Sequence, residues 1–287
     1  MTNFDNVSQA STISTKYIDV SGVRYAYREL GQANPSDPTP LVFLQRFRGT
    51  LDDWDPGFVD EMARTRHVIL FNDAGIGTST GSAATSVDEK ACNAADFVKA
   101  LGYHSVDVLG FSMGGFVAQA IAMAEQTLVR KVVLVGTGAG GNPDNEPPTD
   151  IVFNIATQTE YRFEDIRYLF FAVGREQETQ AFIERVLARS DELEPVVGPE
   201  VMGVMAQLIG DFMSGASGHY SRLNELRQPT LIVSGDHDPF FPAKNHWVLY
   251  RELANAQLAM YPNAGHGPHQ QHPQAVAAQI DYFLATT

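Results

Sequence analysis

Residues 106–121 read VDVLGFSMGGFVAQAI, and this stretch decides the fold. A nearly apolar run is followed by the pattern G-x-S-x-G around Ser112, and apolar positions at helical spacing come next. Gly110 and Gly114 are required because side chains two residues before and after the serine would collide. The stretch therefore predicts a strand, a strained turn that presents the Ser112 hydroxyl, and a helix whose Met113 amide faces the same site. The alternative is a chance match in a glycine-rich loop.

Short apolar runs on both sides of this stretch predict eight strands. Ser21 and Gly22 alone separate the first two runs, which alternate in polarity and predict a hairpin at an exposed sheet edge. The later runs are almost continuously apolar, which is typical of parallel strands covered by helices on both faces. The predicted strands are 16–20, 23–29, 41–45, 67–72, 106–109, 131–135, 230–234 and 257–261. The predicted helices between them are 56–64, 86–101, 113–124, 243–253 and 273–285.

The alternation of strands and helices breaks between Gly136 and Thr230. This segment opens with the linker GTGAGGNPDNEPPTD and then shows helical periodicity, for example over residues 176–190. The apolar face of that helix is Phe182, Ile183, Val186 and Leu187. We therefore expect an α/β fold with a mostly parallel eight-stranded sheet and a helical cap inserted after the sixth strand. The expected division is residues 1–136 for the first part of the core, 137–229 for the cap and 230–287 for the rest of the core.

Composition excludes several classes of protein. The 287 residues carry 34 acidic and 20 basic side chains, a net charge of −14, which argues against nucleic acid and anionic membranes as partners. Cys92 is the only cysteine, so the chain has no internal disulfide and cannot build a thiolate zinc or iron–sulfur site. The first residues lack a secretory leader pattern, and no apolar run reaches the ~20 residues of a membrane span. We expect a cytoplasmic protein, with a homodimer left open.

A nucleophilic serine requires a base, and the base requires a carboxylate that orients it. The segment 235–239, GDHDP, follows one predicted strand, and the segment 263–267, NAGHG, follows another. Asp236 and Asp238 compete for the carboxylate role. We favour Asp238, which stands three residues after Gly235 on the loop before Pro239. Asp236 would then be a turn former.

His266 is the predicted base among the three histidines at 266, 269 and 272, because small neighbours leave room for a substrate around it. A metal site built from these histidines is disfavoured, since no carboxylate stands at ligand spacing beside them. The remaining histidines are predicted to be surface or structural residues: His67, His104, His219, His237 and His246.

The segments GFSMGG, GDHDPFFP and AGHGPH, in this order, resemble the α/β-hydrolase fold family over nearly the whole chain. With a cap after the sixth strand, they are similar to the branch of carboxylesterases, lactonases, carbon–carbon bond hydrolases and cofactor-free haloperoxidases. The segment FNDAGIGTSTG also resembles the family, with Asp73, Gly75 and Gly77 shaping a turn near the site. The resemblance implies acyl transfer by Ser112, Asp238 and His266 without cofactor or metal.

One segment departs from the family pattern. The family commonly has His-Gly after the third strand, where this chain has Gln45 and Arg46 in LQRFRGTLDDWD. The second oxyanion donor, beside the Met113 amide, is a backbone N–H that Phe47 can still supply. Arg46 or Arg48 could meet an anionic substrate. The competing interpretation, that both arginines are solvated or paired with Asp52, Asp53 or Asp55, is the more favoured of the two.

Aromatic residues and methionines of the cap predict a small-molecule cavity for an apolar ester or lactone, although most of these side chains pack the cap onto the sheet. The candidate substrate contacts are Arg46, Phe111, Phe170, Phe171 and Met205. A carbon–carbon bond hydrolase, a haloperoxidase or perhydrolase, and a non-catalytic ligand-binding protein on the same fold remain alternatives. Haloalkane dehalogenation is excluded, because it needs a carboxylate where Ser112 stands.

Overall fold

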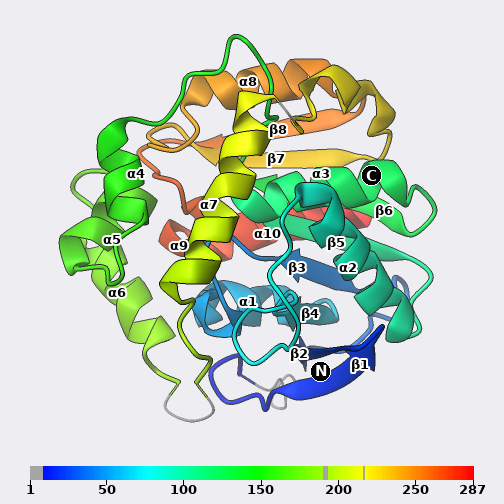
Figure 1. Ribbon diagram of the computed structural model, residues 1–287. Coiled ribbons are helices and arrows are strands. Elements are labelled where there is room, and N and C mark those ends of the chain that lie inside the picture. Colours follow the sequence, from blue (N-terminus) through cyan, green and yellow to red (C-terminus); the bar gives the residue numbers. More distant parts are fainter. Residues whose placement is uncertain (1–8, 190–192, 216) are drawn as a thin grey trace.

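The strands of this computed structural model, which describes residues 9–189, 193–215 and 217–287, form one eight-stranded sheet (Figure 1). Their order is β1-β2-β4-β3-β5-β6-β7-β8. Only the pairs β1·β2 and β2·β4 are antiparallel, so the mostly parallel sheet with an edge hairpin is confirmed. The strands are β1 (Lys16–Val20), β2 (Val23–Leu30), β3 (Leu41–Leu44), β4 (Val68–Phe71), β5 (Val106–Phe111), β6 (Val129–Val135), β7 (Thr230–Gly235) and β8 (Ala256–Tyr261).

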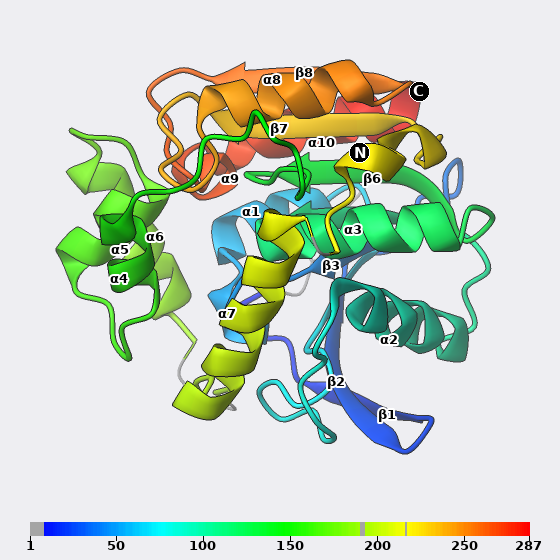
Figure 2. The same ribbon diagram turned by 45° about the horizontal axis from the view of Figure 1, so that its top comes forward.

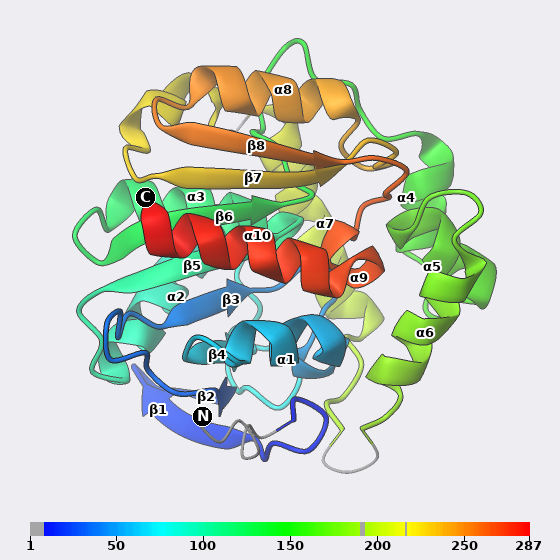
Figure 3. The same cartoon turned by 180° about the vertical axis from the view of Figure 1, so that it is seen from behind.

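Helices cover both faces of the sheet, as the continuous apolar runs predicted. The helices α1 and α10 pack side by side on one face, with the short α9 at their end (Figure 3). The helices α2 and α3 pack together on the other face, and α8 shares their apolar core. These elements are α1 (Pro56–Ala63), α2 (Val87–Ala100), α3 (Met113–Ala124), α8 (Ala243–Glu252), α9 (Pro268–Gln271) and α10 (Pro273–Thr286), with short 3-10 turns η1 (Leu51–Asp53) and η2 (Tyr220–Glu225).

The insertion after β6 is helical, and it has two parts. The helices α4 (Asp150–Ala156), α5 (Phe163–Phe170) and α6 (Glu176–Val186) form a lobe beyond the carboxyl ends of the strands, while α7 (Pro199–Ser214) crosses separately in front of α3 (Figure 2). We call α4–α6 with their linking turns the cap lobe. Side chains of this lobe pack with the α1 and α10 side of the core, whereas α7 packs with the α2 and α3 side.

The predicted helix at 176–190 is too long. The α6 helix ends at Val186, and Leu187, expected on its apolar face, is 72% exposed. Phe182 is buried against Phe171, so only part of the predicted face reaches the interior. Position 190 lies outside the described residues. A short helix on the rim of a lobe has too little partner surface to bury a full apolar stripe.

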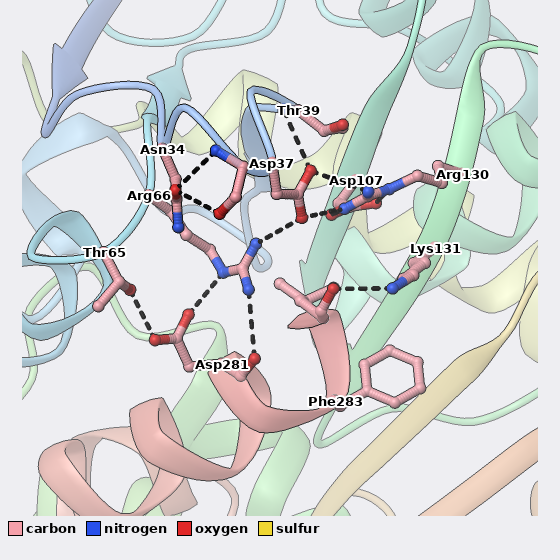
Figure 4. Close-up of polar contacts among 12 residues, drawn as sticks. Asn34, Asp37, Thr39, Thr65, Arg66, Asp107, Arg130, Lys131, Asp281 and Phe283 are labelled. Carbon is pink, nitrogen blue, oxygen red and sulfur yellow. Dashed lines mark hydrogen bonds and ion pairs between the residues drawn. The ribbon is translucent and has the colours of Figure 1, made fainter. Parts of the chain in front are cut away.

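A cluster of ion pairs lies where the parallel strands β5 and β6 begin, at the end of the sheet away from Ser112 (Figure 4). Arg130 binds the fully buried Asp107 through two hydrogen bonds of 2.9 and 2.6 Å, and it also binds Asp37 at 2.9 Å. Arg66 joins Asp37 to Asp281 of α10. Burial by itself would raise the pKa of Asp37, but the hydrogen bonds and charge of Arg130 outweigh it and hold this pKa at about 2.

Arg130→Met should therefore lower the free energy of unfolding by about 3 kcal/mol, because it leaves Asp107 buried without its cation. The pKa of Asp37 is lower in the folded state than the ~3.9 of an unfolded aspartate, so its contribution is present above pH ~4 and is lost as pH falls toward 2. In urea unfolding, the difference in the free energy of unfolding between wild type and Arg130→Met should therefore narrow as pH falls from ~4 toward ~2. Arg64→Met, at an exposed arginine, is the control, and a difference that widens in acid would contradict the prediction.

Candidate active site

The turn between β5 and α3 holds Ser112 in a strained backbone conformation, with φ +55° and ψ −119°. A Cβ on Gly110 would lie 2.2 Å from the Gly114 carbonyl oxygen, and one on Gly114 would lie 2.0 Å from the Leu44 carbonyl oxygen. The two glycines are thus required by close backbone approach, which is the reason that the sequence motif suggested.

Backbone contacts hold this strained turn in place. The Ser112 N–H donates to the Val135 carbonyl of β6 at 2.9 Å, and the Ser112 carbonyl accepts from the Gly115 N–H and the Thr137 hydroxyl, each at 2.8 Å. A non-glycine residue at positive φ persists only where its surroundings over-determine it, and such positions gather at functional sites. The Ser112 side chain is left partly exposed at the start of α3.

The structure brings His266 and Asp238 together. The Nδ1 atom of His266 lies 2.9 Å from Oδ2 of Asp238, and both side chains are buried. The other carboxylate oxygen, Oδ1, accepts from the N–H groups of Phe240 and Phe241 at 2.8 and 3.0 Å. A carboxylate oriented in this way can accept a hydrogen bond from the Nδ1–H group of the imidazole. The Nε2 atom then has a free lone pair with which to accept a proton.

Asp236 lies elsewhere. Its carboxylate contacts Nδ1 of the exposed His237 at 2.6 Å and accepts from the Ala264 N–H at 3.3 Å. Burial would raise the pKa of Asp236, but these hydrogen bonds outweigh it and lower the pKa. Asp236 therefore braces the turn before His266 from outside, while Asp238 contacts the imidazole itself.

Ser112 and His266 line one cavity of about 290 Å³, which opens between the cap lobe, α7 and the sheet. This volume lies near the lower end of the range for small-molecule sites, about 300–1,000 Å³. Most of its walls are apolar. The other lining residues are Arg46, Phe47, Met113, Phe116, Asn142, Asn145, Pro147, Pro148, Phe153, Ala156, Thr157, Tyr161, Phe170, Ala206, Ile209, Met213, Phe240 and Phe241.

Of the five predicted substrate contacts, Arg46 and Phe170 line this cavity. Phe111, Phe171 and Met205 do not. Phe111 is fully buried behind the cavity wall, where its ring centroid lies 4.9 Å from that of His266 and 4.5 Å from that of His269. Phe171 turns toward Phe182 within the lobe, and Met205 lines a separate small cavity of about 30 Å³ behind Met113. Neighbours in sequence point in different directions, so adjacency to Ser112 or Phe170 did not place these side chains in the site.

Two backbone N–H groups are available to an oxyanion. Within the part of the chain that the structure describes, neither the Phe47 N–H nor the Met113 N–H has a hydrogen-bond acceptor, and both residues line the cavity. Met113 is also the first residue of α3, where the helix dipole favours negative charge. The arrangement supports the predicted role of both amides.

The two arginines of the same loop differ. Arg46 pairs with Asp53 at 2.7 Å, as the favoured interpretation predicted, and is 9% exposed. Arg48 pairs with none of the predicted aspartates. Its guanidinium donates to the carbonyls of Gln158 and Thr159 in the cap lobe.

His104 and His237 are exposed, whereas His246, His269 and His272 are held by burial or packing. Burial lowers the pKa of His269 to about 3 and that of His246 to about 4, so both are neutral. His246 lies 4.0 Å from Asp238, and His272 stacks on Tyr261. Among the described residues no three histidine, cysteine or acidic side chains lie close enough to hold a metal ion.

The sequence could not separate the lining residues of the cap from its packing residues. Phe153, Thr157 and Tyr161 come from the cap lobe, and Ile209 and Met213 come from α7. Their spacing resembles that of ordinary packing residues, so only the tertiary structure separates lining from core. No helix in the described ranges is both long and apolar enough to cross a membrane.

The profile of the alpha/beta hydrolase fold family matches residues 39–273, and the chain belongs to this family. It is 27% identical to the 2-hydroxy-6-oxononadienedioate/2-hydroxy-6-oxononatrienedioate hydrolase of Burkholderia vietnamiensis, over 98% of this chain and 99% of that protein. An alpha/beta hydrolase fold protein from Chitinophaga pinensis is 28% identical and superposes with a TM-score of 0.85, over 98% of this chain and all of that one.

A thermophilic esterase from Thermogutta terrifontis shares the fold. It is 19% identical with a TM-score of 0.72, over 95% of this chain and 98% of that one. The chain is thus an alpha/beta hydrolase that is similar in sequence to the hydrolase from Burkholderia vietnamiensis and shares its fold with the esterase.

Replacing each of the two candidate carboxylates by an amide separates their roles. Asp238→Asn should lower kcat by about 10³- to 10⁴-fold, because an amide cannot hold the His266 tautomer that accepts a proton at Nε2. Asp236→Asn should cost less than about tenfold, since that side chain only braces the turn. Steady-state rates on a reactive ester measure both. A larger loss at position 236 would reverse the assignment.

Proposed function

We propose that this protein is a serine hydrolase that cleaves a neutral ester or lactone of small to medium size through an acyl-enzyme on Ser112. One observation carries the proposal. Ser112, His266 and the two residues with unbonded backbone N–H groups all line a single apolar cavity, and Asp238 contacts His266 from behind. These are the parts that acyl transfer requires.

The mechanism follows from the roles that these atoms can take. His266 removes the Ser112 proton at Nε2, and the serine oxygen attacks the substrate carbonyl. The negative oxygen of the tetrahedral intermediate accepts from the Phe47 and Met113 N–H groups. Asp238 stabilises the imidazolium, which then protonates the leaving alcohol. A water molecule, activated by the same histidine, hydrolyses the acyl-enzyme.

Electrostatics favour a neutral substrate over an anionic one. Arg46 is the one Lys or Arg side chain among the cavity's lining residues, and Asp53 neutralises it at 2.7 Å. Residues 137–229, which supply most of the roof, contain 15 acidic and seven basic residues, a net charge of −8. A carboxylate entering this cavity would lose its hydration beside apolar walls and would be repelled by the surrounding charge.

A carbon–carbon bond hydrolase is the second candidate, favoured by the relative from Burkholderia vietnamiensis, which aligns over almost the full length. That protein's name describes substrates with two carboxylates. Such a dianion would meet only Arg46 in this cavity, already paired with Asp53. The charge balance therefore supports the ester or lactone over the dianionic diketone.

An activated serine can be tested directly by intact mass after incubation with a fluorophosphonate. We expect a single adduct on wild type and none on Ser112→Ala, whose hydrolysis should fall by about 10⁴-fold or more. Wild-type protein that is folded yet unlabelled would refute an activated serine and favour a non-catalytic ligand-binding protein on the same fold.

The preference for neutral substrates is measurable with two matched esters, 4-nitrophenyl butyrate and 4-nitrophenyl hemisuccinate, whose acyl groups each have four carbons. The neutral butyrate should have a kcat/KM higher by about tenfold or more, and added salt should narrow the gap by screening the acidic residues around the cavity. A preference for the hemisuccinate would instead support a substrate that carries carboxylates.

A further inference from the structure

Arg48 has a backbone conformation that its residue type rarely adopts. Its φ is +52°, and in the part of the chain that the structure describes only Ser21, Ser112 and Asn263 share such a positive φ among non-glycine residues. Glycine is the residue that normally takes this conformation, and the chain places Gly49 one position later. The strain must be offset by contacts of the side chain, because the backbone gains nothing from an arginine at this position.

The side chain of Arg48 reaches across to the cap lobe. Its Nη2 donates to the Thr159 carbonyl at 2.7 Å, and its Nη1 donates to the Gln158 carbonyl. Both carbonyls belong to the turn between α4 and α5. The guanidinium also lies over the ring of Tyr161, 4.5 Å from its centroid, and Tyr161 lines the catalytic cavity. Arg48 therefore links the core to the cap lobe, which forms one wall of the cavity.

Hydrogen bonds within the loop 45–50 also hold this loop in place. The Gln45 side chain accepts from the Arg46 N–H at 2.8 Å and donates to the Thr50 carbonyl at 2.8 Å. The Arg46 guanidinium donates to the Phe47 carbonyl at 2.9 Å. The Phe47 N–H thus lies in a loop with fixed neighbours, and it is left unbonded toward the cavity. Arg48, the next residue, carries the only side chain of this loop that bonds to the carbonyls of the cap lobe, within the described residues.

We propose that Arg48 is a positioning residue that couples the seating of the cap lobe to the orientation of the Phe47 N–H. When the lobe is seated, its carbonyls hold Arg48 at positive φ, which fixes the Phe47–Arg48 peptide, whose carbonyl accepts from the Arg46 guanidinium. Phe47 is thereby held so that its own N–H, one peptide earlier in the chain, faces the oxyanion. When the lobe shifts, the strain is released and the second oxyanion donor turns away. This inference rests on the proposed function, because it assigns to Arg48 the completion of that same oxyanion site.

Because Arg48 has a positive φ, glycine can replace it without backbone strain. Arg48→Gly removes the bonds to the lobe but suits the positive φ, so its thermal midpoint should stay near that of wild type. Its kcat on 4-nitrophenyl butyrate should fall by about tenfold or more, with KM changed by less than about threefold, because a misplaced oxyanion donor weakens the transition state alone. Arg48→Lys keeps one donor for the carbonyls and should recover part of the loss.

Inhibition by phenylboronic acid distinguishes a misplaced oxyanion donor from a general loss of active-site structure. Its tetrahedral adduct on Ser112 mimics the oxyanion, so its inhibition constant should weaken in Arg48→Gly by about the same factor as kcat/KM. Arg162→Met is the control, since Arg162 is an exposed arginine of the same lobe whose side chain pairs with the nearby Asp165, and it should behave as wild type.

Either of two results would overturn the coupling. One is an unchanged kcat in Arg48→Gly, and the other is a lower kcat with unchanged boronate affinity. Absence of ester turnover in wild type would refute the proposed function and the coupling with it. Wild-type turnover with an unaffected Arg48→Gly would refute the coupling alone.

Discussion

The close backbone contact at the end of β5 is the constraint on which the site depends. Gly110 and Gly114 allow the turn to fold tightly, and Gly114 at the same time rests against the Leu44 carbonyl at the end of β3. A side chain at either glycine would separate these segments. One contact therefore presents Ser112, aims the Met113 N–H and sets the start of the loop that carries Phe47.

The carboxyl ends of the parallel strands bring the remaining groups to this turn. β7 ends just before Asp238, and β8 ends shortly before His266, so residues far apart in sequence meet at one edge of the sheet. The ion-pair cluster around Arg130 (Figure 4) lies at the other end of the strands, because Asp107 and Arg130 stand at the starts of β5 and β6. Stability and chemistry are thereby divided between the two ends of the same strands, and buried charge at one end does not disturb the site at the other.

The roof of the site comes from two separate pieces of one insertion. The cap lobe packs toward α1 and α9, while α7 packs toward α3, and the cavity lies between them. The contacts that span from the core to the lobe include Arg48 to the Gln158 and Thr159 carbonyls and Arg185 to Asp55. These polar contacts add to the apolar packing that joins the lobe to the α1 and α10 side of the core.

The sequence by itself determined the sheet, the elbow and the preference for Asp238, because alternation, glycine spacing and chain order are local or topological signals. All eight strands lie within two residues of their predicted bounds. It did not determine which side chains face the cavity: Phe111 of the core and Phe171 and Met205 of the insertion lie outside it, while Phe153 and Tyr161 lie inside. Only the tertiary structure decided this, and the partners of Arg48 with it, because lining and packing residues bury similar apolar surface and differ only in what stands opposite them.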